Sequence, residues 1–122
     1  MKQILLVDDY VSGRQVLREK LEMHGYVCQE VEDGAEALKA IQAEHFDLVI
    51  TDNQMPVMTG LELLQSLAKK PKNRRLPIIL LTGNLTEPLQ KAARMAGASA
   101  IFKKPYKDQE LLSAITRIFG EG

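Results

Sequence analysis

The sequence has few of the features that would place it in an oxidising compartment or in a membrane. Its single cysteine, Cys28, excludes an internal disulfide and fits a reducing compartment. No apolar run approaches the ~18 residues that a membrane span requires. The start Met-Lys-Gln-Ile also lacks the layout of a signal peptide. We therefore expect a cytoplasmic protein that does not bind a membrane.

An excess of charge of one sign is absent as well. Sixteen basic and sixteen acidic residues cancel to a formal net charge of zero. Domains that bind nucleic acid usually carry a clear basic excess, so we expect no direct contact with nucleic acid. The 122 residues, 45% of them hydrophobic, suit one domain over 1–122 with a substantial core.

Several short apolar runs end in side chains that can do chemistry. Two early runs end in carboxylates, and two later runs end in a hydroxyl and in a pair of lysines. In chain order these side chains are Asp8 and Asp9, Asp52, Thr82, and Lys103 with Lys104. Open α/β sheets place their active groups at the carboxyl ends of the strands. The pattern therefore indicates one site built from the ends of several strands.

Strand and helix patterns alternate along the chain. We expect strands at 4–7, 27–31, 48–50, 78–81 and 100–102, and helices near 12–24, 35–44, 61–68, 86–96 and 108–119. Gly25 and Gly97 are typical residues to end the first and fourth helices. Asp33 and Gly34 predict a turn. The basic stretch 69–75 is interpreted as a solvated connection.

The apolar stripes of these helices indicate which faces pack on the sheet. The third helix is expected to turn Leu61, Leu64, Leu67 and Ala68 inward. The fourth helix offers mostly alanines. Small side chains bury little area, so we expect the fourth helix to be the least firmly held.

The connections predict the topology. Each is too long for a hairpin, so parallel strands with right-handed helical crossovers are expected. The first, third and fourth strands are wholly apolar and belong inside the sheet, whereas the second is mixed and the fifth is short. The order 2-1-3-4-5 satisfies this sorting and is already known for flavodoxin-like folds. By matching that known case, we predict an α/β, doubly wound, five-stranded parallel sheet in this order with helices on both faces.

In that order the first and third strands are neighbours, so Asp8, Asp9 and Asp52 should converge. Two carboxylates ~4 Å apart repel by roughly 4 kcal/mol at an effective dielectric constant near 20. Such a cluster is either partly protonated or neutralised by a cation. With oxygen ligands and no nearby His or Cys, Mg²⁺ is the indicated ion.

These residues carry a resemblance. Asp8-Asp9, Asp52 with Met55-Pro56 and Gly60, then Thr82, then Lys104-Pro105, make the chain similar over essentially its whole length to receiver domains of two-component response regulators, of the chemotaxis-regulator kind. The resemblance implies a signalling domain that is not an enzyme beyond catalysing its own phosphorylation and dephosphorylation. Its partner would be a histidine kinase or a histidine phosphotransfer protein.

The resemblance also implies a role for each site residue. Asp52 would accept the phosphoryl group from a phosphohistidine. Asp9, Asp52 and the main-chain carbonyl of Gln54 would bind Mg²⁺ directly, and Asp8 mainly through water. Thr82 and Lys104 would hold phosphoryl oxygens. Lys104 is preferred over Lys103 because it precedes proline, with a cis bond expected between Lys104 and Pro105.

Two further implications concern how a signal leaves the domain. Phosphorylation would be read by a partner or by a homodimer formed through the fourth and fifth helices. Many family members have Tyr or Phe three residues before the site lysine, whereas this chain has Ile101. Phe102 should face the other side of the sheet. Coupling through a rotating ring is therefore in doubt, and a shift of the Thr82 loop and the fourth helix remains available.

Two other functions share parts of this pattern. A phosphatase of the haloacid dehalogenase type also forms an aspartyl phosphate, but it expects a second acid two residues after the nucleophile, where this chain has Gln54. A flavin-binding electron carrier would need a loop rich in hydroxyls and glycine after the first strand. Asp8-Asp9-Tyr10 has the wrong charge for that role.

Overall fold

The computed structural model describes residues 1–73 and 76–121 of the chain. Within these residues a five-stranded parallel sheet has the order β2-β1-β3-β4-β5, which confirms the predicted order. The strands are β1 (Gln3–Val7), β2 (Val27–Val31), β3 (Leu48–Asp52), β4 (Ile78–Thr82) and β5 (Ala100–Lys103). The helices are α1 (Val11–Met23), α2 (Gly34–Ala43), α3 (Gly60–Ala68), the short 3₁₀ helix η1 (Pro71–Asn73), α4 (Glu87–Met95) and α5 (Asp108–Ile118).

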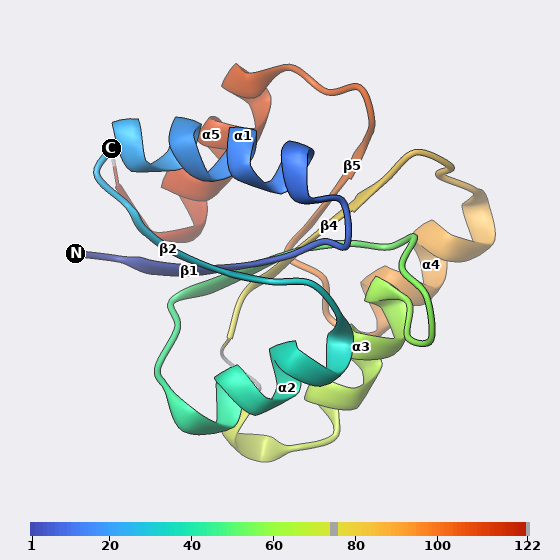
Figure 1. The fold of residues 1–122 in the computed structure, drawn as a ribbon. Coiled ribbons are helices and arrows are strands. Elements are labelled where there is room, and N and C mark those ends of the chain that lie inside the picture. Colours follow the sequence, from blue (N-terminus) through green and yellow to red (C-terminus); the bar gives the residue numbers. More distant parts are fainter. Residues whose placement is uncertain (74–75, 122) are drawn as a thin grey trace.

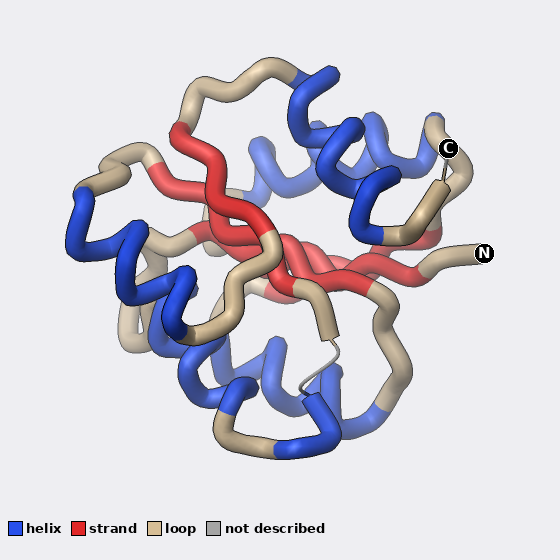
Figure 2. Tube along the Cα trace, turned by 180° about the vertical axis from the view of Figure 1, so that it is seen from behind, coloured by secondary structure: helices blue, strands red, loops and turns tan. Residues whose placement is uncertain are grey.

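The helices form two layers with the sheet between them. Figure 1 shows α1 and α5 on one face and α2, α3 and α4 on the other, and the reverse view in Figure 2 shows the strands between the same layers. The arrangement confirms the doubly wound fold. It also brings the carboxyl ends of β1 and β3 together at one edge of the sheet.

Alternation along the strands divides the core in two. Leu5, Val49 and Leu80 belong to a cluster with residues of α2, α3 and α4. Ile4, Ile50 and Ile79 belong to a second cluster with residues of α1 and α5. All five residues of β3 and of β4 are buried, as expected of strands covered on both faces.

The inward face of α3 differs from the predicted stripe. Leu63 is fully buried and Ala68 is exposed, so the prediction for Ala68 was wrong. The face that packs on the sheet contains Gly60, Leu63, Leu64 and Leu67. Gly60 sets this face because it begins the helix directly beneath the backbone that follows Asp52.

One local prediction changes, and another can be followed only in part. Asp33 and Gly34 do not form a turn, because Gly34 begins α2 and the Asp33 carboxylate caps it by accepting a hydrogen bond from the N–H of Glu36. The basic stretch 69–75 includes η1, and its residues Arg74 and Arg75 lie outside the described residues.

The caps expected around α1 and α4 are present. Gly25 and Gly97 follow these helices with φ of +87° and +97°. The Thr86 hydroxyl caps α4 by accepting a hydrogen bond from the N–H of Leu89. Only Ala93 of α4 is fully buried, in contrast to three leucines of α3. The helix α4 therefore buries less apolar side chain than α3, and the expectation that it is the least firmly held helix stays a prediction.

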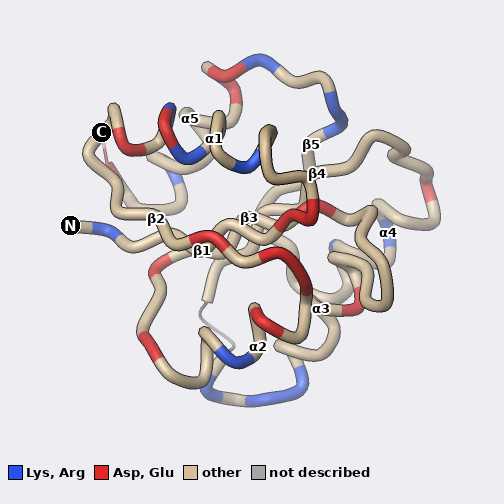
Figure 3. The backbone as a smooth tube through the Cα atoms, in the orientation of Figure 1, with Lys and Arg blue, Asp and Glu red and all other residues tan. Residues whose placement is uncertain are grey.

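Charge is spread over the molecule. Figure 3 shows basic and acidic positions on both helical layers, in keeping with the zero net charge. Among the described helices, none has the length and apolar character needed to cross a membrane.

Candidate functional site

Asp8, Asp9 and Asp52 converge where β1 and β3 end, as predicted. One carboxylate oxygen from each lies within 4.8 Å of the others. Val7 of β1 is paired with Thr51 of β3, so the residues that follow them come out at the same edge of the sheet. Their exposure is graded: Asp52 is buried, Asp8 is partly buried and Asp9 is exposed. Asp52 is therefore the innermost of the three acids.

The Asp52 carboxylate is held at both oxygens. Oδ2 accepts a hydrogen bond from the N–H of Gln54 at 3.1 Å. Oδ1 lies 2.7 Å from Nζ of Lys104, an ion-pair distance. The alignment is not that of a hydrogen bond, and Oδ1 is buried without an aligned donor among the described residues. Asp52 therefore presents one oxygen with unused capacity to accept a further partner.

Asp8 faces an excess of negative charge. Its Oδ1 accepts a hydrogen bond from the N–H of Tyr10 at 3.0 Å, and its Oδ2 lies 3.8 Å from Nζ of Lys104. Burial raises the pKa of Asp8, and the charges of Asp52 and Asp9 raise it further, against the opposing effects of Tyr10 and Lys104. The ammonium of Lys104 thus forms ion pairs with two carboxylates, those of Asp52 and Asp8, and the carboxylate of Asp9 lies beside them.

These residues fit a divalent cation of the hard class. The donors are carboxylate oxygens, and one of them is a buried oxygen without an aligned partner. Mg²⁺ takes one or two protein carboxylates and keeps water on its remaining positions, which suits a cluster of acids that is exposed to solvent at Asp9.

The two lysines at the end of β5 separate as expected. Lys104 enters the site, whereas Lys103 is exposed and pairs in register with Thr82. The N–H of Lys104 donates to the carbonyl of Thr82 at 2.8 Å, and the bond to Pro105 is cis, as predicted. Residue type alone did not separate the two lysines, but the position before proline did.

Thr82 ends β4 with a fully buried side chain. Its hydroxyl oxygen accepts a hydrogen bond from the N–H of Asn84 at 3.1 Å. The preceding residue, Leu81, is paired with Asp52, so Thr82 lies at the same edge of the sheet as the acids. Its predicted role as a ligand of phosphoryl oxygens stays a prediction.

The side chain of Gln54 makes a contact that the sequence did not reveal. Its Oε1 accepts a hydrogen bond from the N–H of Gly83 at 3.0 Å. The contact joins the loop after β3 to the loop after β4, directly beside Asp52. The expected use of the main-chain carbonyl of Gln54 as a metal ligand stays a prediction.

Asn53 is a second residue that the sequence analysis missed. Its side-chain Oδ1 accepts a hydrogen bond from the N–H of Leu61, and its main-chain N–H donates to the carbonyl of Leu81 at 2.7 Å. Asn53 directly follows Asp52, and these two hydrogen bonds connect it to the start of α3 and to the end of β4. An Asn directly after a strand-end acid was the available signal, because Asn commonly bonds nearby backbone in turns.

Ile101, in place of the expected aromatic, packs in the cluster beneath α2, α3 and α4. Phe102 lies on the other face of the sheet, with its ring centroid 5.9 Å from that of Tyr106. Within the described residues this confirms that no aromatic ring of β5 lies on the side of Ile101.

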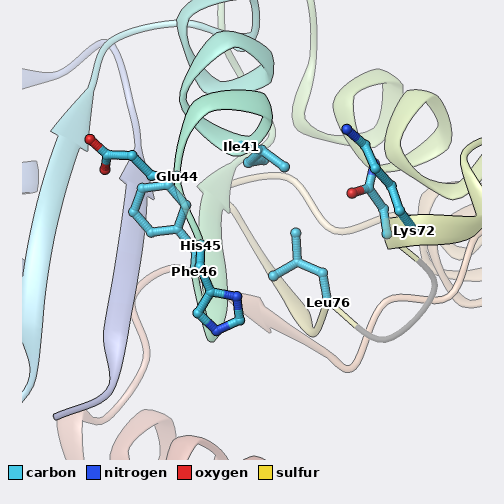
Figure 4. Close-up of a pocket in the computed structure, with 7 residues that line it drawn as sticks. Ile41, Glu44, His45, Phe46, Lys72 and Leu76 are labelled. Atoms are coloured by element: carbon cyan, nitrogen blue, oxygen red, sulfur yellow. The ribbon is translucent and has the colours of Figure 1, made fainter.

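A pocket at the opposite edge of the sheet is unrelated to the acids. Ile41, Phe46 and Leu76 contribute apolar surface, and Glu44, His45, Lys72 and Asn73 complete the lining. Figure 4 shows the carboxylate of Glu44 and the ammonium of Lys72 far apart and pointing away from each other. The polar groups therefore do not converge on a ligand, and the pocket lies where β3 begins rather than where it ends.

Comparison with known proteins gives a consistent result. The family model described as "Response regulator receiver domain" matches residues 4–116. Chemotaxis protein CheY of Pseudomonas aeruginosa is 31% identical over 118 residues, which cover 96% of this chain and 95% of that protein.

Two solved structures are similar along the whole chain. The response regulator TrrA of Thermotoga maritima, in complex with Mg²⁺ and BeF, is 36% identical with a TM-score of 0.86, covering 97% of this chain and 99% of that one. The receiver domain of a sensor histidine kinase from Pseudomonas aeruginosa, with a magnesium ion coordinated in its active-site cleft, is 29% identical. Its TM-score is 0.87, and the match covers 98% of each chain.

Proposed function

The chain belongs to the response regulator receiver domain family of two-component signalling, and we propose that Asp52 is its phosphoryl acceptor, working with Mg²⁺. The observation that carries the proposal is the state of Asp52: a buried carboxylate at a strand end, with one oxygen lacking an aligned donor, beside two further acids and a lysine. Histidine kinases phosphorylate receiver domains, so the donor we propose is a phosphohistidine on such a kinase or on a phosphotransfer protein.

In the proposed reaction a carboxylate oxygen of Asp52 attacks phosphorus in line. An O–P bond forms as the P–N bond to the imidazole breaks, and the imidazole nitrogen keeps the electron pair. Water later attacks the phosphorus, which releases inorganic phosphate and restores the carboxylate. In both steps the domain catalyses a reaction of its own Asp52 and does not act on a separate substrate protein.

Charge is the main obstacle, because an anionic phosphoryl group must approach a cluster of three carboxylates. Mg²⁺, when bound, neutralises part of that charge and that of the phosphoryl oxygens. Of the chain's own residues, Asp9 and Asp52 would hold the ion directly with the main-chain carbonyl of Gln54, and Asp8 through water. Lys104 is already 2.7 Å from Asp52 and supplies a compact positive charge.

Thr82 and Lys104 would hold the phosphoryl oxygens once the group is transferred. The Thr82 hydroxyl can donate a hydrogen bond to such an oxygen while it still accepts one from Asn84. The same residue then offers a route to the output, because its loop leads into the lightly packed α4. We propose that displacement of this loop and helix carries the signal.

The test is phosphorylation by a small-molecule donor. The chain is incubated with acetyl phosphate and Mg²⁺ and its intact mass is measured. We expect a lasting gain of one phosphoryl group that depends on Mg²⁺ and vanishes in Asp52→Asn, a change that keeps the size of the side chain. An equal gain in Asp52→Asn would exclude Asp52 as the acceptor. Rapid release of phosphate over many turnovers with no mass gain would favour a phosphatase instead.

A further inference from the structure

Arg14 is a mostly buried cation that contacts the backbone of the acidic loop. Its side chain is only 11% exposed, although α1 is a surface helix. Its Nε donates to Oε1 of Glu30 at 2.7 Å. Its Nη1 donates to the main-chain carbonyl of Asp8 and, at 3.3 Å, to that of Val31. One guanidinium therefore joins α1, the end of β1 and the edge strand β2.

The contacts of Arg14 complete the fixing of Asp8. The N–H of Asp8 donates to the same Val31 carbonyl at 3.2 Å, and its side chain accepts from Tyr10. The carbonyl of Asp8 belongs to the planar peptide between Asp8 and Asp9, so the contact from Arg14 restrains the orientation of that peptide. Arg14 thereby restrains the direction in which the chain enters Asp9.

The anchor of Arg14 is itself restrained. Glu30 is 14% exposed and receives a second ion pair from Arg18 at 3.1 Å. Burial alone would raise the pKa of Glu30, but the hydrogen bonds from Arg14 and Arg18 bring it below its ordinary value. Glu30 is thus a carboxylate that holds the guanidinium in place. Arg18 is 40% exposed and makes its described contacts with Glu30 and Glu22, away from the backbone of Asp8.

We infer that Arg14 is a positioning residue for the metal site: it sets the peptide between Asp8 and Asp9 so that both carboxylates face the ion bound with Asp52. The inference rests on the proposed function, since it concerns the same Mg²⁺. Partners that orient the ligands of a metal typically change its affinity 10–100-fold when they are removed.

Charge and geometry predict opposite signs for the loss of Arg14. A guanidinium near the acids repels Mg²⁺, so removal of its charge alone should tighten binding. Removal of a positioning residue should weaken binding, because the carboxylates lose their common direction. The sign of the change therefore separates the two roles.

The experiment is a titration of the full chain with MgCl₂, followed by the amide resonances of residues 8–10. We expect Arg14→Gln to weaken Mg²⁺ binding about tenfold or more. The matched control Arg18→Gln loses one ion pair with the same Glu30 and one with Glu22. Its affinity should stay within about twofold of the parent's, because ion pairs of an exposed side chain contribute little and Arg14 still holds Glu30. Arg14→Lys keeps the charge but cannot reach Glu30 and both carbonyls at once, so its affinity should lie between those of Arg14→Gln and the parent.

A second readout separates positioning from folding. Unfolding by urea is measured with and without Mg²⁺, and the increment due to the ion reports its affinity for the folded state. A substitution that only weakened the fold would lower the free energy of unfolding equally with and without Mg²⁺. The difference between the two values would then be unchanged. We expect the increment to shrink in Arg14→Gln and to persist in Arg18→Gln.

Several results would overturn the inference. Binding by Arg14→Gln as tight as the parent's, or tighter, would assign Arg14 to charge or packing alone. Parent affinity in Arg14→Lys would do the same, and that variant decides the matter if Arg14→Gln does not fold. If Arg18→Gln lost as much Mg²⁺ affinity as Arg14→Gln, the loss would be assigned to the disturbance of Glu30, which both arginines contact, and not to Arg14 itself. If the parent itself does not bind Mg²⁺, the proposed metal-dependent function fails, and this inference fails with it.

Discussion

Nζ of Lys104 lies 2.7 Å from Oδ1 of Asp52 and 3.8 Å from Oδ2 of Asp8, so one ammonium serves two carboxylates that come from neighbouring strands. This lysine occupies a place beside the very oxygen that lacks an aligned hydrogen-bond donor. A group that binds to this oxygen of Asp52 is therefore expected to move the Lys104 ammonium. Phosphorylation of Asp52 would in this way change the position of Lys104, the residue that follows β5.

The first prediction concerns this movement of Lys104. In Lys104→Ala, acetyl phosphate should still modify Asp52, but the amide resonances of α4 should shift little on phosphorylation, because no ammonium follows the new group. Lys103→Ala provides the matched control, since Lys103 is exposed and lies outside the site. Its response should equal the parent's. Equal effects of the two changes would mean that the wrong lysine was assigned.

The second prediction concerns Gly60. An added Cβ would overlap the main-chain oxygen of Asp52 and approach Leu80 and Asn53, none of which is free to withdraw. Gly60→Ala should therefore lower the free energy of unfolding by about 1–3 kcal/mol. Urea unfolding measures the change.

Gly13→Ala is the control for Gly60→Ala. At Gly13 the added Cβ would meet the ring of Tyr10, an exposed side chain that can rotate away. Alanine also suits a helix better than glycine by about 1 kcal/mol. We expect Gly13→Ala to leave stability unchanged or slightly raised. A loss as large as that in Gly60→Ala would contradict the claim that the Tyr10 ring gives way easily.

The third prediction is a pH dependence at Tyr26. Burial first, and then Glu121, whose Oε1 accepts a hydrogen bond from the phenol at 3.0 Å, raise the pKa of Tyr26 to about 12. The folded state thus favours the protonated phenol. Its contribution to stability is complete below the unfolded pKa of about 10 and is lost as the pH rises toward 12.

The comparison that isolates this group is with Tyr26→Phe, because other groups also titrate at alkaline pH. At neutral pH the variant should lose about 0.5–1.5 kcal/mol for the hydrogen bond. Above pH 10 its unfolding curve should approach that of the parent. If the free energies of unfolding of the parent and of Tyr26→Phe differed by the same amount from pH 8 to pH 12, the ionisation of Tyr26 would not be coupled to folding.

The fourth prediction concerns the Gln54 contact with Gly83. Gln54→Leu keeps the size of the side chain but cannot accept the N–H of Gly83. The Gly83 amide should exchange with deuterium several-fold faster, in line with the ~1 kcal/mol net value of a hydrogen bond. The amide of Asn84, which donates to Thr82, is the internal reference and should be unaffected.

The convergence of the acids was accessible from sequence for a specific reason. The apolar content of the strands indicated which of them lie inside the sheet, and the known fold order that satisfies this sorting makes the ends of β1 and β3 neighbours. The residues that directly follow these two strands, Asp8, Asp9 and Asp52, are then expected at one place. The prediction therefore depended on the strand order and not on side-chain directions.

The contacts that depend on side-chain direction were not accessible. Arg14 and Gln54 reach across to other elements, and nothing in their local spacing says which way they turn. The inward face of α3 was predicted in part: Leu64 and Leu67 are buried and Leu61 packs against the core, but Ala68 is exposed and the buried Leu63 was missed. Capping by Asp33 was missed because Asp-Gly is an equally good signal for a turn.

Ile101 has a consequence for whatever reads this domain. Its branched aliphatic side chain is packed among the residues beneath α4 and has no polar tip that could be displayed or withdrawn. A binding partner at the α4 and β5 surface would therefore have to recognise a change in the position of the main chain, because there is no aromatic rotamer at residue 101 to recognise. Replacing Ile101 with tyrosine would offer such a partner a second, independent cue.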